Sequence, residues 1–278
     1  MRPILQERIR VEERRAAIGR PSPWLRLAVL LVALFLMLPS VIVVMMSFSS
    51  GKLLTFPPPG YGLDWYAHFF DSRQWTDSTL ISLQIALLAT AAATVLGTLA
   101  AIALVRGRPR GAGLMRAILL SPMIVPLIVT GLGMYIAVRQ AGLASYPALV
   151  AAHTVLGVPY VLLAVSASLY GLPREYDHAA HSLGASRGYT LWHVTLPLIR
   201  PGVAVGALFA FVTSWDELVV ALFLSEPTTR TLPVTMWEQA RYTTDPTIAA
   251  ASSMLTMVTF LVLLAALLLR GLRRAQPA

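Results

Sequence analysis

Long apolar runs without charge recur along the chain and are separated by short charged segments. A helix needs about 20 mostly apolar residues to cross the hydrocarbon core of a bilayer. The runs predict an all-α fold, a polytopic membrane protein with six transmembrane helices, at about 24–47, 79–105, 117–138, 147–170, 202–224 and 247–269.

The composition supports a membrane protein and excludes several other classes. Hydrophobic residues make up 56% of the 278 residues and charged residues only 13%, whereas soluble domains carry about 25% charged residues. So little charge cannot cover a water-facing surface of this size, which excludes an ordinary soluble enzyme, a disordered chain and a coiled coil. The chain has no cysteine, so it has neither a disulfide framework nor a thiolate metal site.

The basic residues indicate how the chain is oriented. Six helices place both termini on one side, and that side then holds most of the 22 Lys and Arg residues. The positive-inside rule predicts that this side is cytoplasmic. The net charge of +9 is therefore explained by topology, and nucleic acid is not an expected partner.

The segments between and beyond the spans divide the chain further. We expect cytoplasmic tails at 1–23 and 271–278 and a six-helix domain at 24–270. An external arm at 48–78 contains a Pro-Pro-Pro-Gly stretch that cannot be helical, followed by an aromatic-rich stretch at 62–70 that favours a short interfacial helix. That helix has no expected ligand role.

Two predicted spans carry small residues at every fourth position, a pattern that lets helices approach closely in lipid. Each set lies on one helix face and is expected to contact protein, either within the chain or across a subunit interface. The sets are Ala89, Ala93, Gly97 and Ala101 in the second span and Gly202, Gly206, Ala210 and Ser214 in the fifth.

The third predicted span has a weakened backbone. Pro122 and Pro126 are followed by Gly131 and Gly133, and prolines and glycines interrupt or loosen the helical hydrogen-bond ladder. We expect a bend here, which either moves during a transport cycle or is static.

The candidate substrate pathway is formed by Trp215, Asp216 and Glu217 in the fifth predicted span. A charged side chain costs about 2.5–3.5 kcal/mol at the bilayer centre on insertion scales, so two in succession are not expected to face lipid. One interpretation is an electronegative passage for a cation, and the other is a pair satisfied by Arg, Ser214 or backbone groups near the outer boundary. The lone His153 is expected to be a hydrogen-bonded packing residue rather than a proton relay.

No catalytic set of Ser, His and Asp can be placed, and no cluster of His, Asp and Glu has metal-ligand spacing. We therefore expect neither enzyme activity nor a metal site in this chain.

The loop at 171–200 contains a short helical segment after Pro173. The stretch from Glu175 to Leu183 suits a helix, and Gly184 suits the left-handed position that ends one. Its apolar face is too small to be a span, so it either binds a partner on the inner side or folds back on the bundle.

This loop resembles the signature loop of membrane subunits of binding-protein-dependent ATP-binding cassette (ABC) importers. The signature runs Glu-Ala-Ala, three residues, Gly, nine residues, Ile, one residue, Leu-Pro, and the spacing fits throughout. His178 stands where the family has Glu, and Glu175 and Asp177 are near enough to substitute electrostatically. The other matching positions are Ala179, Ala180, Gly184, Val194, Leu196 and Pro197.

The resemblance implies the type I ABC importer permease fold, with this loop as a coupling helix that docks on an ATPase dimer. ATP and Mg would be bound by that partner, because this chain has no phosphate-binding loop and no cofactor of its own. Further implied partners are an external solute-binding protein, membrane lipid and a second permease subunit, either a homologue or a copy. The implied ATPase-coupling residues are Glu175, His178, Ala179, Ala180, Gly184, Leu196 and Pro197.

Stretches at 62–66, 214–225 and 231–237 resemble polyamine permeases of the spermidine/putrescine type. The implied function is a non-enzymatic permease subunit that forms the path for a polyamine delivered by an external binding protein, with ATP hydrolysis coupled through 175–197. Two alternatives remain open: an ABC permease for another small organic solute, and a self-contained secondary transporter. The latter should show an internal repeat, and none relates 1–139 to 140–278.

Overall fold

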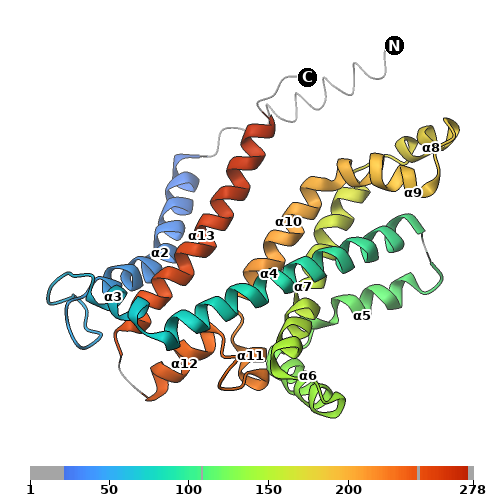
Figure 1. Cartoon of the computed structure of the whole chain (residues 1–278). Coiled ribbons are helices and arrows are strands. Elements are labelled where there is room, and N and C mark those ends of the chain that lie inside the picture. Colours follow the sequence, from blue (N-terminus) through green and yellow to red (C-terminus); the bar gives the residue numbers. More distant parts are fainter. Residues whose placement is uncertain (1–21, 108, 243–244, 275–278) are drawn as a thin grey trace.

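The computed structural model describes residues 22–107, 109–242 and 245–274, and the regular elements within them are helical (Figure 1). Five helices are long and apolar enough to cross a membrane, and a bent pair makes a sixth candidate span. The predicted all-α polytopic fold is confirmed. Most of the predicted tails, at 1–21 and 275–278, lie outside the described residues.

The helices are named as in Figure 1, and η marks a π-helical segment. Their bounds are α2 (Pro23–Ser47), α3 (Asp64–Asp71), α4 (Arg73–Ile102), η1 (Ala103–Gly107), α5 (Ala112–Ile124), α6 (Leu127–Ala141), α7 (Ser145–Tyr170), α8 (Glu175–Ser182), α9 (Arg187–Thr190), η2 (Leu191–Thr195), α10 (Leu196–Trp215), α11 (Val219–Leu224), α12 (Leu232–Tyr242) and α13 (Thr247–Arg274).

The first, second and sixth predicted spans are present as α2, α4 and α13, with shifted ends. α2 begins at a Ser22 cap, whose Oγ accepts a hydrogen bond from the backbone of Leu25. α4 begins at Arg73 rather than 79, because its polar first turns extend the helix beyond the apolar run. α13 continues to Arg274, past the predicted start of the C-terminal tail. The fourth span is present as α7.

The third predicted span, 117–138, is wrong as a single helix. α5 and α6 meet at an angle of 108°, with Val125 in an extended conformation and Pro126 capping α6. Proline has no backbone N–H to donate, and it forces the residue before it out of the helical region. The expected bend is therefore confirmed, but it divides the span instead of only kinking it.

The fifth predicted span, 202–224, is also divided. A nearly continuous helix runs from Arg187 through α9, η2 and α10 to Trp215, and a break then precedes α11. The break arises because the side chain of Glu217 takes the hydrogen bonds of the first backbone N–H groups of α11. Asp216 and Glu217 mark the position of this break in a run that is otherwise apolar enough to suggest one helix.

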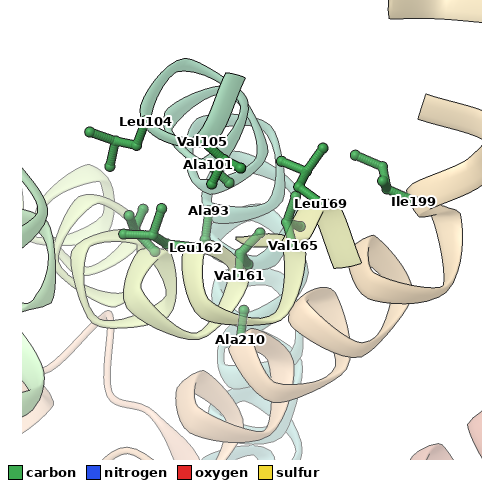
Figure 2. Packing of buried hydrophobic residues seen from close by; sticks show 11 residues of the cluster. Ala93, Ala101, Leu104, Val105, Val161, Leu162, Val165, Leu169, Ile199 and Ala210 are labelled. Atoms are coloured by element: carbon green, nitrogen blue, oxygen red, sulfur yellow. The ribbon is translucent and has the colours of Figure 1, made fainter. Parts of the chain in front are cut away.

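α4, α7 and α10 lie side by side and enclose the main apolar cluster, in which Ala93, Val161 and Ala210 meet (Figure 2). A Cβ added to Gly97 would lie 2.6 Å from Cβ of Val161, and one added to Gly206 would lie 2.8 Å from Cα of Val161. Both glycines therefore permit a helix separation that no larger residue would allow. The predicted small-residue faces contact protein within the chain.

The remaining helices are distributed around this core. α2 packs along α13, and α3, α11 and α12 lie at the opposite end of the molecule from α8 and α9 (Figure 1). α3 confirms the predicted aromatic helix. It is anchored by the buried Phe69, which packs on Trp75 of α4, and by Tyr66, whose hydroxyl lies 2.7 Å from that of Ser47 in α2.

Candidate functional site

A cavity of about 380 Å³ opens at the break between α10 and α11. The α5–α6 bend and α7 provide the other walls, with Met123, Leu127 and Tyr160 among the lining residues. Among the described residues that line the cavity, Asp216 and Glu217 are the charged ones. The cavity therefore combines apolar walls with negative charge.

The two adjacent carboxylates have different environments. Asp216 is exposed, whereas Glu217 is only 6% exposed. Oε1 of Glu217 accepts a hydrogen bond from the backbone of Val220 at 2.8 Å, and Oε2 accepts one from Ala221 at 2.9 Å. Glu217 therefore caps α11, where a negative charge also interacts favourably with the helix dipole.

His153 of α7 lies behind this cap. Its Nε2 is 3.8 Å from Oε2 of Glu217, and its Nδ1 is 2.8 Å from Oγ of Ser214 in α10. The ring is 1% exposed, so it connects α7 to the α10–α11 break from within the protein. This agrees with the hydrogen-bonded packing role expected from the sequence.

Trp215 lies away from the cavity. It is 3% exposed, its indole N–H donates to the backbone oxygen of Leu255 in α13 at 3.2 Å, and its ring stacks on Phe211. The structure thus separates three consecutive residues by location: Trp215 packs against α13, Asp216 is exposed to the cavity, and Glu217 caps α11.

The inner loop forms the predicted short helix, α8. Leu183 is its C-cap, and Gly184 follows with φ +86°. No atom outside the local backbone lies near the position of an added Cβ on Gly184, so this position requires glycine because of its backbone conformation and not because of space.

α8 leaves most of its surface open and does not bury a face against the spans. None of its residues is buried, and Glu175, His178 and Ala179 are exposed while Ala180 is half-buried. Leu183, just beyond its end, is 90% exposed.

Trp192 of η2 adds to the same exposed end of the molecule, at 69% exposure. Leu196 and Pro197 form the first turn of α10, directly after η2, and Pro197 has no backbone N–H to donate to that segment. Exposed apolar groups gathered in this way are typical of an interaction surface.

Asp177 is a further candidate for a role in coupling, although its position in the sequence indicated only a negative charge beside His178. Its Oδ2 lies 3.2 Å from Nε of Arg106 in η1, and its Oδ1 accepts a hydrogen bond from Thr195 of η2 at 3.0 Å. These three residues are far apart in the chain, so no local spacing rule could have paired them. Within the described residues, no group of three or more His, Asp or Glu could hold a metal ion.

The family described as "Binding-protein-dependent transport system inner membrane component" matches residues 93–274. The chain belongs to this family. It is therefore a multi-pass membrane permease that forms the translocation pathway of an ABC importer, and the secondary-transporter alternative is set aside.

Three curated relatives show the range of the family. The permease is 34% identical over 242 residues to the putrescine transport system permease protein PotI of Escherichia coli (strain K12), covering 84% of this chain and 86% of the relative. It is 27% identical to the spermidine/putrescine permease PotC of the same strain, covering 84% and 89%. It is 32% identical to the molybdenum transport system permease ModB of Mycobacterium bovis, covering 71% and 78%.

Solved structures with the same fold include a bacterial ABC transporter for the acidic polysaccharide alginate. The TM-score is 0.67 at 19% identity, over 89% of this chain and 98% of that chain. An inward-facing MetNI methionine ABC transporter matches with a TM-score of 0.61 at 18% identity, over 72% and 95%. At these identities the likeness establishes the fold, which is that of type I ABC importer permeases.

Proposed function

We propose that this permease conducts a polyamine, such as putrescine or spermidine, delivered by an external solute-binding protein. The acidic cavity at the α10–α11 break carries the proposal. Carboxylates attract an ammonium group, and the ring of Tyr160 can add a cation–π contact. Neither Lys nor Arg is among the described lining residues to oppose this attraction.

The apolar part of the cavity suits the rest of such a solute. Polyamines are methylene chains between ammonium groups, and Met123, Leu127 and Leu156 present apolar surface beside the acidic end. Relatives 34% and 27% identical to this chain are named for putrescine and for spermidine/putrescine transport, which favours the same solute class here.

The energy for transport would come from a separate ABC ATPase dimer that binds ATP and Mg²⁺ and docks on α8. The exposed helix, the apolar Leu183 at its end and the left-handed Gly184 support this assignment. Glu175, His178, Ala179 and Ala180 would lie at or near the contact, and Leu196 and Pro197 would set the entry of α10. His178 would meet the ATPase where the family signature has Glu.

The proposed orientation places α8 and both termini in the cytoplasm of a bacterial cell, with the permease in the inner membrane. The excess of Lys and Arg on that side supports it. A second permease subunit, either a homologue or a copy of this chain, would complete the pathway. A large part of α5 and α6 is left exposed, with Ile124 and Ile128 on the surface.

Uptake of radiolabelled putrescine by cells that express the complete transporter, including the solute-binding protein and the ATPase, tests the proposal. Asp216→Asn should lower uptake about tenfold, since a close charge pair contributes about 1.5 kcal/mol or more. Asp71→Asn, the same change on the exposed end of α3, serves as the control. Uptake that is unaffected by Asp216→Asn would contradict the proposal.

A molybdenum solute is the second candidate, because ModB is 32% identical to this chain. Molybdate is an anion, and an acidic cavity would repel it. Molybdate uptake that exceeds putrescine uptake in the same cells would favour this candidate.

A further inference from the structure

The helix α8 is held to the membrane spans through one carboxylate. Among its described side chains, Asp177 makes the polar contacts that reach other helices. Oδ2 lies 3.2 Å from Nε of Arg106, and Oδ1 accepts a hydrogen bond from Oγ1 of Thr195 at 3.0 Å. Asp177 therefore joins α8 to two segments that are distant from each other in sequence.

Both of these segments are π-helical. Arg106 lies in η1, which continues α4, and Thr195 lies in η2, which leads into α10. A π-turn closes a wider ring than an α-turn, and such turns occur frequently at functional sites. A change between π and α geometry shifts the register of the helix beyond it. η1 and η2 are therefore points at which α4 and α10 can yield, by changing register relative to the core.

The end of α4 is also tied to the end of α7. Nη2 of Arg106 donates to the backbone oxygen of Leu172 at 3.1 Å, and Nη2 of Arg174 donates to that of Val105 at 2.9 Å. Leu172 and Arg174 flank Pro173 in the link between α7 and α8. Polar contacts therefore link the region around α8 to all three helices that enclose the main core, α4, α7 and α10 (Figure 1).

We propose that Asp177 is a positioning residue that transmits the displacement of α8 to α4 and α10, with η1 and η2 as the yielding points. This inference rests on the proposed docking of an ATPase on α8, which would supply the displacement. The side chains of Arg106 and Asp177 are 14% and 20% exposed, so water screens their attraction less than that of a surface pair. Thr195 is buried and restricts the rotation of the carboxylate.

Asp177→Asn tests the transmission because it removes the charge and keeps the shape. The permease is purified with its ATPase in a background that carries Val212→Cys, a position that lines the cavity. The rate of maleimide labelling at this cysteine is measured with and without ATP and Mg²⁺, in the absence of any transported solute. In the parent protein ATP should change the rate. In Asp177→Asn the ATPase should co-purify as before, and the ATP-dependent change should fall about tenfold.

Two further variants separate transmission from a general loss of structure. Arg106→Gln should reduce the ATP-dependent change by a similar factor, and the double variant should reduce it no further, because both substitutions remove the same contact. Thr195→Val removes the second contact alone and should give a smaller loss, and it also serves as the measurement if Asp177→Asn does not assemble. Asp71→Asn, on the exposed end of α3, should leave the response unchanged.

If Asp177→Asn assembles with the ATPase and retains the full ATP-dependent change, the inference is overturned and docking on α8 stands. If Asp177→Asn does not assemble, an undiminished ATP-dependent change in Thr195→Val overturns the inference instead. If the parent protein itself retains no ATPase and shows no response to ATP, the proposed docking fails, and the inference fails with it.

Discussion

Oε1 of Glu217 lies 2.8 Å from the backbone nitrogen of Val220, which makes this acid within the fifth span the cap of a short helix. Asp216, its neighbour in sequence, is exposed and lines the cavity beside it. The two interpretations of this acidic pair, a solute passage and a structurally satisfied pair, therefore apply to different residues. Asp216 remains the candidate for the passage, and Glu217 holds the break that places it.

Glu217→Gln should lower the thermal stability of the permease in detergent, whereas Asp216→Asn should not. The amide replaces one of the two accepting oxygens with an NH₂ donor, so the hydrogen bonds from Val220 and Ala221 cannot both keep their present geometry. Loss of a helix cap costs about 0.5–2 kcal/mol. The unfolding midpoint of each purified variant measures this difference, and equal midpoints would show that Glu217 does not act as a cap.

Gly184→Ala should weaken association with the ATPase while the permease still inserts into the membrane. The residue has φ +86°, a conformation that costs a residue with a side chain about 1 kcal/mol or more. The turn should relax and shift Leu183 at the end of α8. Co-purification of the ATPase measures the effect.

Gly188→Ala is the matched control for this change, because Gly188 has open space around it and no positive φ. Equal retention of the ATPase by the two alanine variants would argue that the left-handed turn is not part of the docking surface.

Gly206→Ala should destabilise the core by about 1–3 kcal/mol, the range for overpacked sites. The added Cβ would lie 2.8 Å from Cα of Val161, which is backbone and cannot move aside without shifting α7. The yield of monodisperse protein and its unfolding midpoint in detergent should both fall. Gly133→Ala, in a helix position with open space, should change neither.

The native chain has no cysteine, which permits a direct measurement of topology. A membrane-impermeant maleimide applied to intact cells should label Asp71→Cys at the end of α3 and should not label Ser182→Cys on α8. After the membrane is opened, both positions should react. Labelling of Ser182→Cys in intact cells would reverse the proposed orientation.

Local features of the sequence were sufficient for much of this structure. The apolar runs gave the positions of the spans, and Gly184 was identified as the end of α8 because a left-handed turn depends on one residue and its neighbours. Gly97 and Gly206 were expected to contact protein because spacing by four puts small residues on one face. Such predictions need no knowledge of distant parts of the chain.

Features that depend on distant residues or on competing hydrogen bonds were not predicted. The run from Pro201 to Leu224 is apolar enough to suggest one helix, and only the position of the Glu217 carboxylate explains why it is divided. Asp216 and Glu217 are equivalent acids in a hydropathy pattern, but one is exposed and the other is buried. The contact of Asp177 with Arg106 joins segments whose pairing is set by the packing of α4, α7 and α10.

The central claim is that this permease moves its solute with energy delivered at α8, and crosslinking from Leu183 tests it most directly. Leu183→Cys carries a photoactivatable crosslinker at a position that is 90% exposed, in cells that express the complete transporter. The account predicts that an ABC ATPase subunit is the main product and that ATP changes its yield. Recovery of lipid alone, or of a second copy of this permease alone, would contradict the account.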